Sequence, residues 1–542
     1  MFTLLVRRAD ESVAVIRLTR DDGRLTAGPQ RVVPSAALPD EIRAGEKDST
    51  RWVWDDTFRW YPRLLAAGLR VERCVDLRLV HGILRRSEFT AGNALHGAPV
   101  GPWDAPQAAP TEADALFVVE PESLPDALGE FLRQRDAVET SAQRSRLELL
   151  TAAESTGALV AVEMRHRGIP WSAARHDELL TDVLGPRPSR AGDRPARMLD
   201  DLAAVRAALR APDLNPDSPA ELIRALRTAG LTVTSTRQWE LQHLEHPVIE
   251  PLLRYKKKQR LLVANGWSWL EAWVRDGRFR PEYVPAAAAT GRWGTSGGGA
   301  LQLPRAVRGA VVADPGWALV VADASQLEPR VLTALSQDGA MARAGEGDLY
   351  EGIVASGAVA TRAEAKVAML GAMYGATQGD GGRLMPRLTR AFPRAIALVE
   401  AAARVGEHGG VVSTLLGRSS PRPGSDAGFD ERPPEDGPGQ VDGGMRAWGR
   451  FTRNFVVQGT AAEWALCWMG ALRRSLTAEF GAGSDAPHLV FFLHDEVVVH
   501  TPASVAPRVA ALMESAATEA GRLLFGDAPV RFPVTVATVT SY

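Results

Sequence analysis

Two acidic residues stand where short apolar strands end. The segment WALVVAD ends in Asp323, and the turn His494-Asp495-Glu496 separates the apolar runs VFFL and VVV. Such runs are typical of strands, and a strand end or tight turn holds a carboxylate on a rigid backbone. Phosphoryl transfer with two divalent ions needs carboxylates that converge from different segments. Asp323 and Asp495 can supply that pair, although each motif alone also fits an ordinary acidic turn.

A second motif, TRAEAKVAMLGAMYG, combines basic residues with helical spacing. Thr361 and Glu364 match a capping box that opens a helix, and Gly375 suits the left-handed conformation that ends one. Four further residues are four positions apart and form one stripe: Arg362, Lys366, Leu370 and Tyr374. Two like charges at this spacing cost about 0.2–0.5 kcal/mol, so an anion such as a triphosphate would favour the arrangement. The alternative is a pair of solvated basic residues beside a core stripe.

The residues after Asp323 predict the start of a helix. Ser325 and Glu328 have the spacing of a capping box. Helical periodicity dominates between about residues 141 and 275, and strands mix with helices from about 315. The segment 418–444 is rich in Gly, Pro and acidic residues, which predicts a surface insertion.

Length and charge bound the class of protein. A chain of 542 residues is long enough for three or four domains, and 45% hydrophobic with 24% charged residues is a globular composition. The net charge of −2 gives no overall nucleic-acid signal, but residues 251–310 carry eleven Lys or Arg against three acids, a local balance of +8. Such a patch can follow a phosphate backbone. The run with Lys256, Lys257 and Lys258 fits a solvated helix face equally well.

Nothing in the sequence predicts a membrane segment. No stretch approaches about 18 consecutive apolar residues, and no targeting signal is visible. Cys74 and Cys467 are the only cysteines and lie far apart, which fits a reducing compartment. We therefore expect a cytoplasmic protein without a membrane partner, associated with the nucleoid if the source is bacterial.

Four motifs in order resemble the DNA polymerase I family (family A): DASQLEPRVL, RAEAKVAMLGAMYG, RFTRNFVVQGTAAE and FFLHDEVVV. The likeness covers roughly residues 140–542. It implies an α/β multidomain, right-hand polymerase that is a monomer and extends a primer on template DNA with dNTPs, by family habit in repair or gap filling. The implied domains are an N-terminal α/β exonuclease-like domain (1–140), a helical thumb (141–289), a palm with an antiparallel sheet (290–334 and 416–542) and helical fingers (335–415).

The resemblance also implies roles for single residues. The catalytic residues would be Asp323, Asp495 and Lys366, with Asp323, Asp495 and Glu496 at two Mg²⁺ ions. The dNTP would contact Gln326, Glu328, Arg362, Lys366, Leu370 and Tyr374, with Glu328 excluding a 2′-hydroxyl. The DNA would contact Arg292, Gln302, Arg450, Asn454, Gln458, His494 and, in the basic run, Lys256, Lys257 and Lys258.

Three positions depart from the family pattern. Leu370 stands where the family has an aromatic residue beside the sugar, Ala324 where it has a tyrosine, and Tyr350 where it has a histidine that assists the phosphates. We expect the change at Leu370 to weaken nucleotide positioning.

The N-terminal region lacks the carboxylates of a proofreading exonuclease. The family site needs a D-x-E on a first strand and two further aspartates, whereas TLLVRRADESVAVIRL offers no such D-x-E and Trp60 and Tyr61 stand about where one of the aspartates is expected. Asp76 alone cannot hold two metals. We predict a degenerate exonuclease-like domain without proofreading, and expect no 5′-nuclease domain ahead of it.

Three other functions compete with this one on the sequence. A binding protein would hold primer–template junctions with an inactive palm, which intact Asp323, Lys366 and Asp495 disfavour. A single-subunit RNA polymerase shares both aspartates and the lysine, but Glu328 and Glu496 disfavour it. A standalone exonuclease fails on the missing carboxylates.

Overall fold

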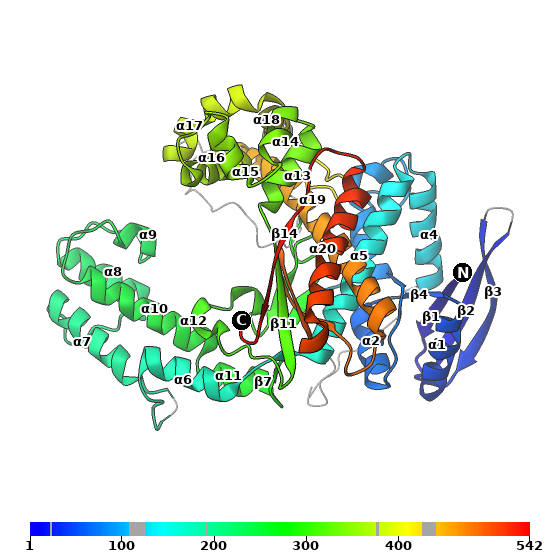
Figure 1. Ribbon diagram of the computed structural model, residues 1–542, viewed down its shortest axis with the longest axis horizontal. Helices are drawn as coiled ribbons and strands as arrows, with labels where there is room; N and C mark the ends of the chain where they lie inside the picture. The colour runs from blue at the N-terminus through cyan, green and yellow to red at the C-terminus, as the bar shows by residue number, and fades with distance from the viewer. Residues whose placement is uncertain (22–23, 108–125, 191, 376–378, 425–440) are drawn as a thin grey trace. The chain divides into compact units, whose positions relative to one another are not determined.

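The computed structural model describes residues 1–21, 24–107, 126–190, 192–375, 379–424 and 441–542, and the elements below are those of this part of the chain. The chain forms two compact units (Figure 1). The first unit comprises Met1–Arg167, Tyr283–Ser296 and Trp317–Val539, and the second comprises Gly168–Glu282, Gly297–Gly316 and Thr540–Tyr542.

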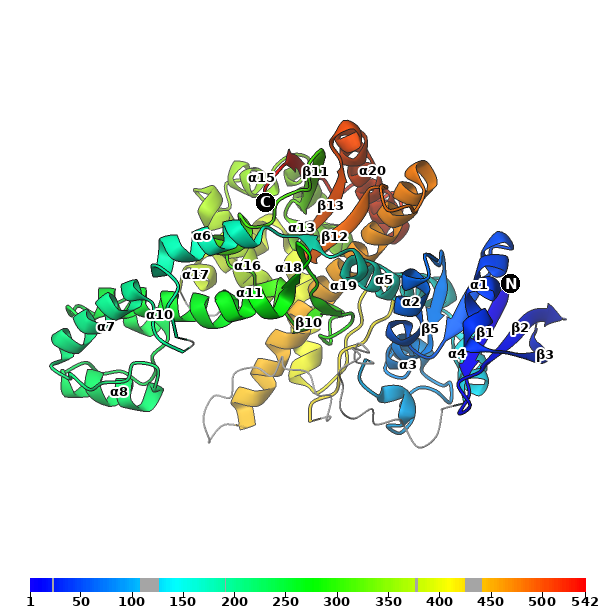
Figure 2. The same cartoon turned by 90° about the horizontal axis from the view of Figure 1, so that it is seen from below.

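The first unit begins with a mixed sheet in the order β3-β2-β1-β4-β5 (Figure 2). β1 pairs antiparallel with β2 and parallel with β4, and β4 pairs parallel with β5. Apolar residues such as Leu4 and Val53 cluster with Phe131, so α4 covers one face of this sheet. The bounds are β1 (Phe2–Arg7), β2 (Val13–Asp21), β3 (Arg24–Val33), β4 (Arg51–Trp54), β5 (Cys74–Asp76), α1 (Leu38–Lys47), α2 (Thr57–Ala66), α3 (Leu77–Leu84) and α4 (Ala127–Thr140).

The acids at the carboxyl ends of β4 and β5 are used as helix caps. Asp56 accepts a hydrogen bond from Phe58 N at 2.8 Å and begins α2. Asp76 is fully buried, accepts from Leu79 N at 2.9 Å and from Thr57 N at 2.7 Å, and begins α3. Burial, and then the Asp56 charge, raise the pKa of Asp76 to about 6. Backbone donors therefore occupy these carboxylates.

A second sheet of the first unit carries the predicted catalytic aspartates. Its described strands are β11 (Trp317–Ala324), β12 (His488–Leu493), β13 (Glu496–Pro502) and β14 (Val534–Val539), in the order β12-β13-β11-β14. Every pairing is antiparallel, as was predicted for the sheet in this part of the chain. The helices α5 (Arg144–Arg167), α19 (Val441–Phe480) and α20 (Ala506–Phe525) pack against these strands.

Six described helices follow β11, and the last five of them lie in the region predicted as fingers. Thr361 caps α16 by accepting from Glu364 N at 3.1 Å, and Gly375 ends it with a φ of 74°, as predicted. α18 packs against α19 and so joins this region to the palm sheet. The helices are α13 (Leu327–Ser336), α14 (Gly339–Ala344), α15 (Leu349–Ala355), α16 (Arg362–Tyr374), α17 (Gly379–Ala391) and α18 (Pro393–Glu407).

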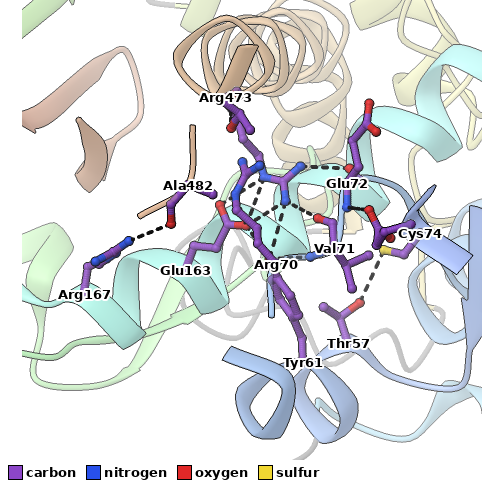
Figure 3. Close-up of polar contacts among 12 residues, drawn as sticks. Thr57, Tyr61, Arg70, Val71, Glu72, Cys74, Glu163, Arg167, Arg473 and Ala482 are labelled. Carbon is purple, nitrogen blue, oxygen red and sulfur yellow. Dashed lines mark hydrogen bonds and ion pairs between the residues drawn. The ribbon is translucent and has the colours of Figure 1, made fainter. Parts of the chain in front are cut away.

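A buried ion network ties the N-terminal region to α5 and α19 (Figure 3). Arg473 of α19 contacts the Glu163 carboxylate of α5 with its Nη2 at 2.6 Å and donates through Nη1 to Glu72 O at 2.8 Å. Tyr61 donates its hydroxyl to Glu163, and Arg70 approaches the same carboxylate at 3.1 Å. The carboxylate is thus held by three partners.

The second unit is mostly helical. Its three-stranded sheet, in the order β6-β8-β7, brings Trp171 and Phe279 together with Trp269 and His176 in one aromatic cluster.

The predicted thumb began at residue 141, but α5 packs within the first unit, against α2 and α19. The described elements are α6 (Ala173–Leu184), α7 (Ala196–Leu209), α8 (Pro219–Thr228), α9 (Gln238–Leu241), α10 (Ile249–Asn265), α11 (Trp267–Trp273), α12 (Arg305–Arg308), β6 (Ile169–Pro170), β7 (Val274–Arg275) and β8 (Arg278–Phe279).

The predicted insertion at 418–444 does not begin at the surface. Arg418, Ser419 and Ser420 are buried, and Arg418 forms an ion pair with buried Glu154 of α5. The local composition concealed this because the partner of Arg418 lies 264 positions away in the sequence. Residues 425–440 lie outside the described residues.

Candidate active site

Asp323 and Asp495 lie at one end of the sheet β12-β13-β11-β14. Asp323 is the last residue but one of β11, where it pairs with Glu496 of β13 and Thr535 of β14. The next residue, Ala324, donates its N–H to the carbonyl of Asp495 at 2.8 Å. This hydrogen bond fixes the strand end that carries one aspartate to the turn that carries the other.

The turn between β12 and β13 is tight and strained. Asp495 N donates to Leu493 O at 2.7 Å across a single residue, which is the hydrogen bond of a γ-turn. The residue between them, His494, has a φ of 57°, a region that side chains other than glycine rarely occupy. Strain of this kind persists where the surrounding structure imposes it, often at functional sites. Here the strands on both sides impose it and thereby set the direction of Asp495.

The two aspartates form a negative site in which their repulsion outweighs the compensation by nearby charge. Burial, and then the Asp323 charge, raise the pKa of Asp495 to about 6, and burial raises the pKa of Asp323. Across the described residues, neither carboxylate forms an ion pair. The nearby Arg292 charge opposes the rise in the pKa of Asp495 without reversing it. Two neighbouring carboxylates that are not ion-paired suit a hard divalent cation, which prefers oxygen ligands.

Two carboxylates, those of Asp323 and Asp495, are the side chains available to a metal at this position among the described residues. Within the described part of the chain, no three His, Cys, Asp or Glu side chains group into a metal site. Asp323 and Asp495 would therefore hold a metal with water and substrate oxygens as the remaining ligands, as is usual for Mg²⁺. The role of Glu496 as a further ligand stays a prediction.

The predicted stripe lies on the exposed face of α16. Arg362, Lys366, Leu370 and Tyr374 are all exposed. Arg362 is paired: its Nη2 lies 2.9 Å from the Asp348 carboxylate, so the fold itself offsets part of its repulsion with Lys366.

Two neighbours complete the Arg362 contact. Gln326 donates its Nε2 to the same Asp348 carboxylate at 2.8 Å. The guanidinium of Arg362 lies 5.5 Å from the ring centroid of Tyr350. Tyr350, one of the departures from the family pattern, therefore supports Arg362 by a cation–π contact.

Glu328 does not complete a capping box, contrary to prediction. α13 begins after Gln326, which adopts a left-handed conformation with a φ of 57° and makes no side-chain cap. Ser325 Oγ instead lies 3.0 Å from Thr535 Oγ1. The S-x-x-E spacing was misleading because the side chain of Ser325 contacts Thr535 of β14 instead of capping α13.

The Glu328 carboxylate is held by two residues from other elements. Arg292 forms an ion pair with it, and Tyr374 donates its hydroxyl to it at 3.3 Å. Burial, and then the Glu328 charge, raise the pKa of Tyr374. The carboxylate therefore bridges the end of α16 to the segment before β11.

A small cavity of about 70 Å³ unites several predicted residues. Although His494 is exposed overall, partial desolvation of its ring, and then the Arg292 charge, lower its pKa to about 4, so this histidine is neutral near pH 7. The predicted residues in the lining are Arg292, Glu328, His494 and Asp495. Apolar residues including Leu327, Leu466 and Phe492 complete it.

Three predicted DNA contacts lie on one face of α19, because Arg450, Asn454 and Gln458 are spaced by four. Arg450 is exposed and packs beside Gly375 at the end of α16, where an added Cβ would meet its Cγ at 2.9 Å. Asn454 keeps a buried Oδ1 that has no partner among the described residues.

The remaining predicted DNA contacts lie in the second unit. Lys256 donates to Thr236 O, Lys258 lies 2.8 Å from the Asp201 carboxylate, and Lys257 is exposed. Part of the basic run is thus used within its own unit. The side chain of Gln302 lies outside the described residues.

Sequence reasoning missed two residues that shape the site. Asp348 pairs with Arg362 and caps α15 by accepting from Glu351 N at 3.0 Å. Its D-x-x-E spacing was the available signal. Buried Arg453 donates to Ala372 O at 2.6 Å and so anchors α16 to α19, for which the sequence carries no local signal.

The fold is that of a polymerase domain. It resembles a solved structure, the POL domain of Pol1 from M. smegmatis in complex with DNA primer-template and dNTP. The TM-score is 0.71 at 19% identity, and the match covers 99% of this chain and 95% of the other. A family model, DNA polymerase family A, matches residues 196–541, which is more than half of the chain. The chain therefore belongs to DNA polymerase family A.

Curated relatives agree with this assignment. DNA polymerase I, thermostable, of Thermus thermophilus is 30% identical over 337 residues, which are 57% of this chain and 37% of the relative. DNA polymerase I of Chloroflexus aurantiacus is 27% identical over 438 residues, which are 73% of this chain and 42% of the relative. The chain thus matches about two fifths of the length of these proteins. None of the described helices is both long and apolar enough to cross a bilayer.

Proposed function

We propose that this chain is a template-directed DNA polymerase that adds deoxynucleotides to a primer 3′-hydroxyl. The observation that carries the proposal is a pair of carboxylates that form no ion pair among the described residues, Asp323 on β11 and Asp495 in the β12–β13 turn, in a chain of family A. The stripe on α16 adds an exposed lysine and arginine that suit a triphosphate.

In the proposed reaction the primer 3′-oxygen attacks the α-phosphorus of the dNTP and pyrophosphate leaves. Two bound Mg²⁺ ions would supply activation of the attacking oxygen and stabilisation of charge at phosphorus. Asp323 and Asp495 would hold these ions, with Glu496 as a further proposed ligand. Arg362 and Lys366 would bind the triphosphate oxygens and orient the leaving group.

Further roles follow the same proposal. Glu328, held by Arg292 and Tyr374, would lie beneath the sugar and exclude a 2′-hydroxyl. Its fixed position favours DNA synthesis over the RNA polymerase alternative. The other residues proposed at the nucleotide are Gln326, Leu370 and Tyr374.

The DNA contacts are proposed in two groups. On the first unit, Arg292, Arg450, Asn454, Gln458 and His494 would lie at the primer–template, with Arg292 and Gln458 at minor-groove acceptors common to all base pairs. In the second unit, Gln302 and Lys256, Lys257 and Lys258 would follow the backbone. The domain names thumb, palm and fingers are part of the same proposal.

We further propose that the N-terminal region does not proofread. Asp56 and Asp76, which lie at strand ends where a metal site would be expected, are engaged as helix caps. In a preparation free of contaminating nucleases, a labelled primer should show no 3′–5′ shortening with Mg²⁺. Digestion at a rate above that of a mock preparation would contradict this.

Primer extension on a recessed template with Mg²⁺ tests the polymerase itself. Template-directed growth should occur with dNTPs and not rNTPs, and both Asp323→Ala and Asp495→Ala should abolish it. The matched control is Asp485→Ala, which alters an exposed aspartate in the loop before β12 and should leave extension unchanged. Tight binding of the junction without extension by wild type would instead support the binding-protein alternative.

A further inference from the structure

A short hairpin, residues 412–420, joins the candidate active site to the N-terminal region. At its turn the N–H of Thr414 donates to the carbonyl of Arg418 at 2.8 Å. Two contacts fix the hairpin to buried Glu463 of α19: the Thr414 hydroxyl donates to its carboxylate, and so does Leu416 N at 3.1 Å. The position of hairpin 412–420 is therefore set by the helix that carries three of the predicted DNA contacts.

The Arg418 side chain packs against the backbone that carries Arg292. A Cβ added to Gly291 would lie 2.6 Å from Arg418 Nε, so the guanidinium occupies the space that a larger residue at this position would need. Gly291 N donates to Ala288 O at 2.9 Å, and Ala288 N donates to Arg292 O at 3.1 Å. This tight turn and the guanidinium beside it together fix where the Arg292 side chain begins.

The hairpin packs just as closely beside Gln458. A Cβ added to the next residue, Gly459, would overlap the Cγ2 atom of Thr414. Arg292 and Gln458 are the two residues proposed at minor-groove acceptors, and each is adjacent in sequence to a glycine that hairpin 412–420 covers. One hairpin therefore supports the backbone of both.

The N-terminal region holds the hairpin from another side. Ser87 is fully buried and donates its hydroxyl to Gly417 O at 2.6 Å. Glu88 N donates to the Ser419 hydroxyl at 2.9 Å. The turn and the strand that follows it are thus both bonded to residues that lie more than 300 positions earlier in the chain.

A buried ion pair lies at the centre of this arrangement. Arg418 is 8% exposed, Glu154 of α5 is fully buried, and their side chains are paired. Burial raises the pKa of Glu154, and the Arg418 charge opposes that rise. Because desolvation offsets much of the attraction, a buried pair contributes little net stability, and its best-attested use is to specify one arrangement. Here the pair holds the guanidinium against Gly291.

We propose that Arg418 is a positioning residue for Arg292, and that the N-terminal region, through hairpin 412–420, keeps Arg292 and Gln458 in place to probe the primer terminus. The inference rests on the proposed polymerase function. Arg418 would touch neither DNA nor nucleotide. Its effect would be on the placement of the two probing side chains, since small misplacements of such groups have large effects on rate.

Extension of a primer whose terminal adenine has carbon in place of N3 tests the inference. N3 is a minor-groove acceptor. Wild type should extend this primer about 10- to 100-fold more slowly than the natural one, because a charge-assisted hydrogen bond to the base is lost. In Arg418→Gln this penalty should shrink by about 3- to 10-fold, since a displaced Arg292 loses the contact in both primers. Each penalty is a ratio within one variant, so differences in the folded fraction cancel.

Further variants separate positioning from folding. Ser87→Ala removes one hydrogen bond to the hairpin, far from the DNA contacts, and should shrink the penalty by about 2- to 3-fold. Arg418→Lys keeps the buried positive charge and should restore part of the penalty. Two controls should retain the wild-type penalty: Arg474→Gln, which alters an exposed arginine of α19, and Glu163→Ala, which removes the carboxylate of the network in Figure 3.

The possible results are distinct. Equal penalties in wild type, Arg418→Gln and Ser87→Ala would overturn the inference, as would a wild type that extends both primers equally, because no contact would then need positioning. A penalty that shrinks as much in Glu163→Ala would assign the effect to general stability and also overturn it. If Arg418→Gln does not fold, Ser87→Ala decides the question. A wild type that fails to extend the natural primer would instead contradict the proposed polymerase function, and the inference with it.

Discussion

Two carboxylate sites in the first unit have opposite electrostatics. Burial alone would raise the pKa of Glu163, but Arg473, Arg70 and the hydrogen bonds lower it to about 2. At Asp495, burial and the neighbouring Asp323 charge raise the pKa to about 6. A carboxylate that forms ion pairs within the fold holds elements together, whereas one that forms no ion pair suits a cationic ligand.

Asp76 shows that a raised pKa alone does not mark a metal site. Its pKa is raised to about 6, as is that of Asp495, yet its oxygens accept backbone hydrogen bonds from Thr57 and Leu79. What distinguishes Asp495 is that its oxygens are not engaged by other described residues in this way. The availability of lone pairs, rather than burial, therefore separates the two kinds of aspartate.

The largest expected effect is a separation of activity from stability at Asp495. Asp495→Asn should lower the primer-extension rate on the order of 1,000-fold or more, equivalent to about 4 kcal/mol of barrier, because a metal ligand is lost. Its free energy of unfolding in EDTA should not fall, since the change removes repulsion with Asp323. Urea denaturation and extension assays on one preparation measure both. A variant that is both inactive and destabilised would break the comparison.

Glu163→Ala should have the opposite profile. Removing the carboxylate leaves Arg473 buried and without an anionic partner, which should lower the free energy of unfolding by about 3–5 kcal/mol. The matched control, Glu479→Ala, removes the partner of exposed Arg508 and should change it little. Extension by the folded fraction at low temperature should stay near wild type. Equal destabilisation by both variants would contradict the role assigned to the network.

The pH dependence of stability should differ in sign at the two sites. The folded pKa of Asp495, about 6, lies above its ordinary 3.8, so its contribution is fully present below about pH 3.8 and is lost as pH rises through 6. The folded pKa of Glu163, about 2, lies below its ordinary 4.5. Its contribution to stability is therefore present above about pH 4.5 and is lost as pH falls through 2.

In EDTA, the free energy of unfolding of Asp495→Asn should therefore rise relative to that of wild type by about 1–2 kcal/mol between pH 4 and 7, after allowance for partial exposure. Chemical denaturation at fixed pH values measures the difference. Glu163→Gln should show the reverse trend, with a deficit that shrinks below pH 4.5. Parallel stability curves for wild type and Asp495→Asn would be inconsistent with the proposed repulsion.

Glu328 is an intermediate case, a paired carboxylate in the candidate active site. Glu328→Ala should reduce discrimination against rNTPs by about 10- to 100-fold, because the proposed barrier to the 2′-hydroxyl is removed. Arg292→Gln keeps Glu328 but removes its ion pair, and it should give a smaller loss. Single-nucleotide incorporation with dNTP and rNTP measures the ratio. Unchanged discrimination in Glu328→Ala would make the carboxylate purely structural.

The smallest expected effect concerns Leu370. This side chain is 39% exposed on α16, so the protein itself does not fix its contacts. Leu370→Phe should tighten the dNTP Kd a few-fold, about 1 kcal/mol or less, and change dideoxynucleotide use by adding a stacking surface beside the sugar. Pre-steady-state incorporation measures both, and Val367→Phe on the same helix is the control. No change in either quantity would remove the hypothesis.

Local patterns were the part of the fold that the sequence predicted well. The cap at Thr361, the end of α16 at Gly375, the strand that ends in Asp323 and the acidic turn after β12 all agree with the structure. Each depends on neighbours a few positions away, which periodicity and capping rules describe. The capping box expected at Ser325 was wrong because strand β14, more than 200 positions away, takes the serine.

The sequence by itself determined which residues carry charge, which elements hold them and the order of the family motifs. Only the tertiary structure decided how those charges are compensated: Arg473 neutralises Glu163 across 310 positions, and Arg292 holds Glu328, while Asp323 and Asp495 are brought together by the strand order β12-β13-β11-β14. The physical reason is that helix and strand signals act over a few residues, whereas ion pairing and burial depend on distances in space between residues far apart in the chain.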